Sequence, residues 1–183
     1  MAATVFHFAI ALSDVDRGVY AELDLRVAQH PSETLRYLVT RTLGYCLSYE
    51  EGIAFSKGGL SDVDDPPVSV RDPTGILLAW IDVGHPSAER LHRASKAARR
   101  VEIYTTHDLA LLRREASSRA VHKVEEIAVF RLDPAFVDAI AARVDRSTKL
   151  ELTRSDGAVY AAFGGARPET LETELARASL VAE

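Results

Sequence analysis

The stretch that decides the fold reads Ile76-Leu77-Leu78-Ala79-Trp80-Ile81-Asp82. Its unbroken apolar run is typical of a strand that is buried on both faces, and Trp80 in the middle of the run is expected to lie in the core. Pro86 then opens an amphipathic helical pattern with a basic outer face, and a second strand pattern follows from Val101 to Thr105. This order of strand, helix and strand predicts a parallel crossover unit.

The sequence that follows this unit alternates between helical and strand patterns. A helix is expected around Asp108 to Ala116, and a strand from Ile127 to Leu132. Asp133 and Pro134 provide an N-cap and a first-turn proline for a further helix. Alternating segments on both sides of Asp156-Gly157 predict a β-hairpin, because this dipeptide favours the tight turn that joins two antiparallel strands.

Toward the N-terminus, the segments Phe6 to Leu12 and Val19 to Val27 alternate between apolar and other residues and flank a turn-like link. They predict an opening antiparallel hairpin. A helix is expected next, with Ser32 as its N-cap and Glu33 in its first turn, where the helix dipole favours a negative charge. Two short strand patterns come after this helix, Ile53 to Phe55 and Val68 to Val70.

Together these elements predict a mixed α/β fold, with one central mixed β-sheet flanked by helices and with β-hairpins near both ends. We expect a single domain over residues 1–183, because the chain has the usual length of one domain. The segment 58–67 is the most loop-like part, since it is acidic and rich in turn formers. The tail 164–183 is expected to form a short helix from Pro168 or to fray.

The composition is that of an ordinary globular protein, with 47% hydrophobic and 27% charged residues. No apolar run approaches the roughly 20 residues that cross a bilayer, and no signal peptide is recognisable. We therefore expect a cytoplasmic protein without a membrane partner. The only cysteine, Cys46, fits a reducing compartment and is expected to be a core thiol.

Charge is distributed unevenly along the chain. The formal net charge of -5 argues against a protein that coats nucleic acid nonspecifically. Residues 50–89 carry eight acids and two bases, however, whereas residues 90–123 carry nine bases and three acids. This order indicates either two solvated faces or an acidic site beside a basic approach surface.

Carboxylates are the main candidates for chemistry, because the common cofactor and nucleophile motifs are absent and the six histidines lack the spacing of metal ligands. Asp82 ends the buried strand at the position where α/β sheets usually bind ligands, and its alternative role is to cap the next helix or to bond the turn after the strand. The cluster Asp62, Asp64 and Asp65 is dense enough to attract a divalent cation, although acidic surface loops often bind nothing.

Several short sequence motifs are together typical of one protein family. They are His30-Pro31-Ser32-Glu33-Thr34, Gly59-Leu60-Ser61, Asp65-Pro66, Thr74-Gly75 and Trp80-Ile81-Asp82-Val83-Gly84, followed by Pro86. With these strings the chain resembles the YaeQ family of bacterial proteins over nearly its whole length. The resemblance implies a variant of the PD-(D/E)-x-K nuclease fold and no settled biochemical function.

In such nucleases, acids from a helix and from two adjacent strands hold one or two Mg²⁺ ions, which polarise the scissile phosphate and generate hydroxide. Carried onto this sequence, the resemblance implies metal ligands from the set Glu33, Asp64, Asp65 and Asp82. The implied catalytic residues are Glu33, Asp82, Arg93 and Lys96. Mg²⁺ is therefore the cofactor that the resemblance implies.

The sequence departs from the family pattern at three positions. Pro67 stands where relatives tend to have a metal-binding aspartate, Leu78 replaces another acid, and Gly84 replaces the lysine that assists the water. An arginine in place of that lysine stabilises phosphate charge but does not readily shuttle a proton. Two hypotheses follow, because a fold does not determine a function.

The first hypothesis is an uncharacterised YaeQ-like binding or scaffold module with a degenerate acidic site. The second is a Mg²⁺-dependent nuclease or phosphodiesterase that acts on nucleic acid. The cations expected to contact nucleic acid are Arg90, Arg93, Lys96, Arg99 and Arg100. The sequence leaves the oligomeric state and the choice between DNA and RNA open.

Overall fold

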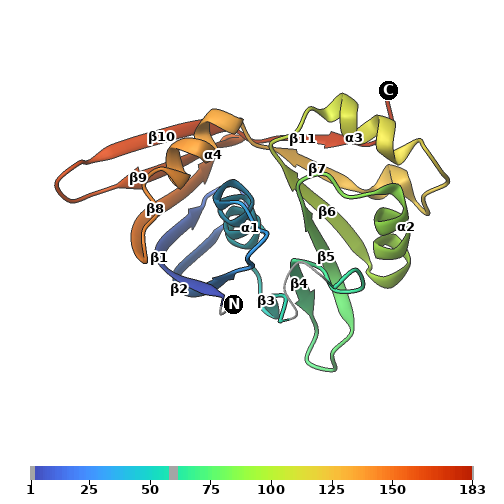
Figure 1. Cartoon of the computed structure of the whole chain (residues 1–183), viewed down its shortest axis with the longest axis horizontal. Helices are drawn as coiled ribbons and strands as arrows, with labels where there is room; N and C mark the ends of the chain where they lie inside the picture. Colours follow the sequence, from blue (N-terminus) through green and yellow to red (C-terminus); the bar gives the residue numbers. More distant parts are fainter. Residues whose placement is uncertain (1–2, 58–61, 183) are drawn as a thin grey trace.

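The computed structural model describes residues 3–57 and 62–182. It contains two β-sheets with helix α1 (Leu35–Leu47) between them, so the mixed α/β class is confirmed and the prediction of one central sheet is wrong (Figure 1). An alternating pattern identifies a strand but not the neighbour with which it pairs. Strand β1 (Thr4–Asp14) pairs in parallel with β8 (Ser147–Ser155) instead of joining the crossover unit.

The first sheet, which we call the hairpin sheet, has the strand order β10-β9-β8-β1-β2. Its remaining strands are β2 (Val19–Gln29), β9 (Ala158–Phe163) and β10 (Glu169–Glu174). Both predicted hairpins are confirmed, since β1 pairs antiparallel with β2, and β8 with β9. Asp156 and Gly157 join β8 to β9 with φ values of 52° and 75°, which are the left-handed values that a two-residue turn of this kind needs.

The second sheet, which we call the crossover sheet, has the strand order β11-β7-β6-β5-β4-β3. Its strands are β3 (Ile53–Phe55), β4 (Val68–Arg71), β5 (Leu77–Val83), β6 (Arg100–Thr105), β7 (Ala128–Arg131) and β11 (Ala176–Ser179). Strands β5, β6 and β7 are parallel, and α2 (Ala88–Ala97) connects β5 to β6. The predicted crossover unit is therefore confirmed. Trp80 in β5 is only 1% exposed, as expected for a core residue.

Each long helix begins at a side chain that caps its first turn. The caps are Ser87 for α2, Asp108 for α3 (Leu109–Ala116) and Asp133 for α4 (Pro134–Ala141). A short 3-10 helix, η2 (Val124–Glu126), precedes β7. The cap of α4 lies at the predicted position, and the helix expected around Asp108 to Ala116 begins at that aspartate, because Asp followed by a helical pattern is a local signal.

The start of α1 differs from the prediction. Its N-cap is Thr34, whose hydroxyl oxygen accepts a hydrogen bond from the backbone N–H of Tyr37. The predicted cap Ser32 instead bonds through its hydroxyl to Nδ1 of His30 at 2.7 Å. The segment before α1 is a turn in which the backbone N–H of Glu33 donates to the carbonyl of His30, so Glu33 precedes the helix rather than lying in its first turn.

The main hydrophobic core is shared by both sheets and α1. It includes Phe8 and Ile10 of the hairpin sheet, Ile81 of the crossover sheet and Leu38 of α1. The predicted core thiol, Cys46, is 0% exposed, and burial raises its pKa to about 12. A second cluster around Trp80 lies between the crossover sheet and helices α2 and α3.

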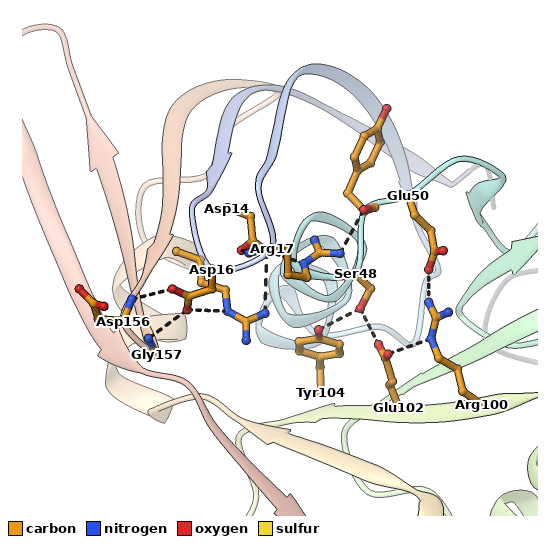
Figure 2. A network of polar contacts seen from close by, with 12 residues as sticks. Asp14, Asp16, Arg17, Ser48, Glu50, Arg100, Glu102, Tyr104, Asp156 and Gly157 are labelled. Carbon is orange, nitrogen blue, oxygen red and sulfur yellow. Dashed lines mark hydrogen bonds and ion pairs between the residues drawn. The ribbon is translucent and has the colours of Figure 1, made fainter.

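A polar network at the C-terminal end of α1 links the two sheets (Figure 2). The C-cap residue Ser48 donates a hydrogen bond to the Glu102 carboxylate in β6 at 2.7 Å. Arg17, in the turn between β1 and β2, pairs with the buried carboxylate of Asp14 at 2.7 Å and donates to the main-chain carbonyl of Tyr49. The end of α1 is thus fixed to both sheets.

A single carboxylate joins the turns of the two hairpins in the same network (Figure 2). Asp16 accepts hydrogen bonds from the backbone N–H groups of Asp156 and Gly157 at 2.8 and 3.0 Å. The hydrogen bond from Gly157 is the main reason that the pKa of Asp16 is lowered from its ordinary value. The turn of the N-terminal hairpin therefore helps to hold the turn of the C-terminal hairpin.

The C-terminal tail forms strands β10 and β11 rather than the expected short helix or frayed end. β10 pairs antiparallel with β9, and β11 pairs antiparallel with β7, so the tail passes from the hairpin sheet to the crossover sheet. Leu175 and Leu180 are buried. Pairing with strands that are distant in the sequence overrides the weak local signal at Pro168.

Part of the predicted acidic loop lies outside the described residues. Residues 58–61, which include the string Gly59-Leu60-Ser61, belong to this part. The rest of the loop, residues 62–67, contains turns and no helix or strand. Within the described ranges, no helix combines the length and the apolar character needed to cross a membrane.

Candidate functional site

A cleft of about 280 Å³ lies at the C-terminal end of β5. Residues of α1, of the acidic segment 62–67 and of α2 form its other walls. Its titratable lining residues are Tyr37, Asp62, Asp65, Asp82, His85 and Arg90. The carboxyl ends of parallel strands are the usual place for ligands in α/β sheets, so this cleft is the candidate site.

The Asp82 carboxylate at the base of the cleft is bonded on both of its oxygens. Its side chain is 3% exposed, and Oδ2 accepts hydrogen bonds from Nε of Arg90 at 2.6 Å and from Nε1 of Trp80 at 3.0 Å. Oδ1 accepts the backbone N–H of Val83 at 3.1 Å. Asp82 thus bonds the backbone of the last residue of β5, and it does not cap α2, because Ser87 is the N-cap of that helix.

Arg90 joins β5, α2 and the acidic segment. Besides its bond to Asp82, its guanidinium lies over the Trp80 ring, with 5.2 Å between Cζ and the ring centroid. It also donates to the main-chain carbonyls of Val63 and Asp65, each at 3.2 Å. The chain itself therefore supplies the positive charge that faces Asp82, and this charge-assisted bond is of the strong class.

Tyr37 forms the α1 side of the cleft. The turn after β5 passes under its ring at Gly84, whose φ of 83° favours glycine. Burial, and next the negative charge of Asp82, raise the pKa of Tyr37 well above its usual range, although Arg41 and Arg90 oppose this effect. Tyr37 is therefore protonated at neutral pH, so it is available as a hydrogen-bond donor and not as a base.

His85 in the cleft lies beside His107, which follows β6. The two ring centroids are 5.6 Å apart. Burial lowers the pKa of His107, and the nearby His85 and Arg36 lower it further. His107 is accordingly neutral at pH 7, where one of its ring nitrogens is an acceptor.

Glu33 is held in a buried ion pair with Arg41. The two side chains are 0% and 7% exposed, and Arg41 donates from Nε and Nη2 to the two carboxylate oxygens at 2.9 and 3.0 Å. The backbone N–H of His30 donates to the same carboxylate at 3.0 Å. Glu33 does not line the cleft, so the structure does not bring it beside Asp82 in that cavity.

The acidic segment is fixed to its surroundings by its own carboxylates. Asp64 pairs with Arg93 of α2 at 2.9 Å, and Asp65 accepts a hydrogen bond from the hydroxyl of Ser56. The Asp62 side chain accepts the backbone N–H of Asp64 at 2.9 Å. Asp62 and Asp65 line the cleft together with Asp82, whereas Asp64 does not.

The cations expected to contact nucleic acid fall into two groups. Arg90, Arg93 and Arg100 pair with carboxylates, Arg100 with both Glu50 and Glu102. Lys96 and Arg99 are exposed, and neither forms an ion pair with a carboxylate in the described residues. Lys96 lies on the outer face of α2 and does not line the cleft.

Of the implied metal ligands, Asp65 and Asp82 line the cleft, whereas Glu33 and Asp64 do not. Across residues 3–57 and 62–182, no group of three His, Cys, Asp or Glu side chains is arranged to hold a metal ion. Alternation along β5 explains part of this separation, because Asp82 shares the face of Trp80 and is directed toward α2. The metal-binding and catalytic roles of Glu33, Asp64, Asp65 and Asp82 stay predictions.

The family assignment is decided by comparison with known sequences. A family model described as "YaeQ protein" matches residues 1–171, which is most of the chain. The chain belongs to the YaeQ family. The Escherichia coli K12 and Salmonella typhi relatives, each called "Uncharacterized protein YaeQ", are 29% identical to it over 161 residues, or 86% of this chain and 87% of each relative. The expectation of a YaeQ-like protein is thus confirmed.

Solved structures of YaeQ proteins share the fold. The structure from Pseudomonas syringae has a TM-score of 0.84 and 29% identity, and it covers 99% of this chain and 97% of its own. The structure from Xanthomonas axonopodis pv. citri has a TM-score of 0.81 and 30% identity, and the match covers 94% of this chain and 97% of the Xanthomonas chain. The arrangement of two sheets around α1 is therefore that of YaeQ proteins.

Sequence reasoning did not place Tyr37 or His85 in the cleft of this YaeQ protein. It also missed Arg41 and Trp80 as the residues that bond the predicted acids Glu33 and Asp82. Arg41 and Tyr37 lie on α1, and Trp80 was expected only as a core residue, although its indole N–H bonds Asp82. The signal for Arg41 was an arginine in the middle of a helix whose other positions are mostly apolar. Such an arginine needs a buried partner, because an unpaired buried charge is costly.

Proposed function

We propose that this YaeQ protein is a non-catalytic binding module on a nuclease-like fold, in which protein donors take the place of metal ions at the acidic residues. The observation that carries the proposal is the pairing of Asp82, whose two oxygens accept bonds from Arg90, Trp80 and the backbone of Val83. Mg²⁺ and Ca²⁺ bind carboxylate oxygens directly, so a metal ion would first have to displace the Arg90 guanidinium.

The other acids support the same proposal. Glu33 pairs with Arg41 in a bidentate, buried arrangement, and Asp64 pairs with Arg93. Pro67, which stands in the place of a family aspartate, lines the cleft and contributes no ligand oxygen from its side chain. Each position at which the nuclease mechanism needs an open carboxylate is thus either paired or replaced.

We propose nucleic acid as the partner of the module. Arg90, Arg93 and Arg100 are engaged in ion pairs with carboxylates and would act by positioning the acidic segment and α2. Lys96 near the end of α2 and Arg99 just after this helix are exposed cations, and they supply the phosphate contacts. Contacts of this kind carry affinity without sequence specificity.

The test combines metal titration with assays of binding and cleavage. For the wild type we expect no change of the melting temperature with Mg²⁺ or Mn²⁺, because ligand binding to the native state would raise it. We also expect metal-independent binding of labelled single- and double-stranded DNA and RNA, and no cleavage above that of Asp82→Asn. This control keeps the shape of the side chain and removes its charge.

Two outcomes overturn the proposal. A melting temperature that rises with metal in the wild type but not in Asp82→Asn, together with cleavage that Asp82→Asn lacks, would establish catalysis. The absence of oligonucleotide binding, with and without metal, would remove nucleic acid as the partner.

A Mg²⁺-dependent nuclease or phosphodiesterase is the second candidate, and one observation favours it: Asp62, Asp65 and Asp82 line the same cleft. Arg90 would then be a cation that competes with the metal. The wild type and the variant Arg90→Gln together distinguish the candidates. A nuclease should bind Mn²⁺ already as the wild type and more tightly as Arg90→Gln, whereas the module should show no response to Mn²⁺ as the wild type.

A further inference from the structure

We propose that the outer face of α2 forms a phosphate-binding groove, separate from the cleft, in which Glu89 occupies the position of the anion when no ligand is bound. The groove has a volume of about 470 Å³ and is lined by Glu89, His92, Arg93, Lys96, Ala97 and Arg119. Its ligand is a phosphate-bearing anion, either a free polyphosphate or the backbone of a nucleic acid. The groove extends the proposed function. It rests on that function only where the ligand is the backbone of a nucleic acid.

Helical spacing brings the groove residues together. Glu89, Arg93 and Lys96 are separated by four and three residues, which places them on one face of α2. Arg119 comes from the segment after α3 and closes the opposite side. One carboxylate and three cations line the groove, and Asp64, which pairs with Arg93 from outside the groove, offsets part of this positive excess.

Glu89 holds the place that a phosphate would take. Its carboxylate lies between two guanidinium groups, at 3.4 Å from Arg93 and 3.5 Å from Arg119. These distances are longer than the roughly 2.7–2.9 Å of strong charge-assisted bonds, and the Glu89 side chain is 65% exposed. Two guanidinium groups that converge on one oxyanion are typical of phosphate recognition, and the weakly held carboxylate is easily displaced.

A backbone contact fixes the walls of the groove. Nδ1 of His92 accepts the backbone N–H of His122 at 3.2 Å, which joins the segment that carries Arg119 to α2. Because Nδ1 is an acceptor, the proton of the neutral ring is on Nε2. His92 therefore adds a hydrogen-bond donor to the groove, and the groove is held in shape without a ligand.

The groove continues toward further cations. A neighbouring hollow is lined by Arg99, Arg100, Lys123 and Glu126 among others, and it adjoins the groove where His122 contacts His92. Lys123 pairs with Glu126, and Arg100 pairs with carboxylates outside the hollow, so Arg99 is the cation there that a longer ligand would reach first. A phosphate chain longer than one group would find cations along this path. Short polyphosphates fit the first groove alone.

The test uses two probes, sodium tripolyphosphate by calorimetry and a fluorescein-labelled single-stranded oligonucleotide by anisotropy, both at low ionic strength. Lys96→Gln and Arg119→Gln should each weaken binding about tenfold, because each removes one charge-assisted contact. Glu89→Gln should tighten binding about threefold, since it removes a competing exposed carboxylate. Lys149→Gln is the matched control, because it removes an exposed cation of the hairpin sheet and should leave binding unchanged.

The sign of the Glu89 effect decides the proposal. Tripolyphosphate binding that is weakened by Lys96→Gln and Arg119→Gln and tightened by Glu89→Gln supports the groove. If the oligonucleotide does not bind at the same time, nucleic acid is removed as the partner and the groove still stands. Oligonucleotide binding that is unaffected by Lys96→Gln and Arg119→Gln overturns the groove and the phosphate contact proposed for Lys96, and it leaves a non-catalytic module with a nucleic-acid partner standing. Weaker binding by Glu89→Gln, in a variant with an unchanged melting temperature, overturns it as well, since Glu89 would then be a structural tie and not a competitor. Failure of both probes to bind also overturns it.

Discussion

Arg41 and Arg90 each hold a carboxylate that is almost completely removed from water. Glu33 is 0% exposed and Asp82 is 3% exposed at the side chain, so neither acid can rely on hydration. The desolvation of such a pair offsets much of the attraction within it, which makes an intact pair a modest contributor to stability. Loss of one partner is a different case, because the remaining charge stays buried without compensation.

The Glu33–Arg41 pair leads to the first prediction. Arg41→Met should lower the free energy of unfolding by about 3–5 kcal/mol, because it leaves the Glu33 carboxylate buried and uncompensated. The double variant Arg41→Met with Glu33→Gln should recover part of this loss, since the buried charge is then gone. Urea denaturation of the wild type and both variants measures the difference.

A matched control tests the role of burial. Arg36 pairs with Asp138 by two hydrogen bonds, but these side chains are 49% and 48% exposed. Arg36→Met should therefore change stability much less than Arg41→Met. Equal losses for the two variants, or no recovery in the double variant, would contradict the view that Arg41 compensates a buried charge.

At the level of elements, the first turn of α1 distinguishes two neighbouring hydroxyl residues. Thr34 accepts the backbone N–H of Tyr37, whereas Ser32 bonds His30 in the preceding turn. Thr34→Ala should lower the free energy of unfolding by about 1 kcal/mol, which is typical of a lost N-cap. Ser32→Ala should stay within about 0.5 kcal/mol of the wild type, as most surface changes do. Thermal unfolding that ranks the two variants the other way would place the helix start at Ser32.

The same turn shows why the sequence predicts elements better than their boundaries. The string Ser32-Glu33-Thr34 offers two cap residues, and the sequence pattern is compatible with either. Where one cap signal stands alone, as at Asp133, the prediction is confirmed. The tight turn at Asp156-Gly157 is confirmed for the same reason, since its chemistry is local.

Features that depend on distant pairing could not be predicted from local patterns. The partition of the strands into two sheets follows from β1 pairing with β8, which is far away in the sequence. The strands of the tail follow from pairing with β9 and β7. The candidate site divides in the same way: the position of Asp82 at the end of β5 is local, whereas the pairing of Glu33 with Arg41 depends on where α1 begins.

For the whole molecule, the decisive feature is the core that the two sheets share through α1. Phe8 and Ile10 belong to the hairpin sheet, and Ile81 and Tyr104 belong to the crossover sheet, yet all four lie in one buried cluster. The tail adds a second connection, since β10 and β11 belong to different sheets. Neither sheet can lose its inner face without exposing the apolar surface of the other, which predicts a single cooperative unit.

Trp80 and Ile10 provide a test of this cooperativity. Trp80 is the only tryptophan and lies in the second cluster behind the crossover sheet, so its fluorescence reports on that sheet. Ile10→Ala, a change in the hairpin sheet, should lower stability by about 2–5 kcal/mol. If the molecule is a single unit, Ile10→Ala shifts the urea midpoint of Trp80 fluorescence as much as the midpoint measured by far-UV circular dichroism. Leu112→Ala, a change in the same buried cluster as Trp80, should also shift both midpoints together. A Trp80 transition that stays in place while circular dichroism moves would mean that the sheets unfold separately, because the loss at Ile10 would then not reach the crossover sheet.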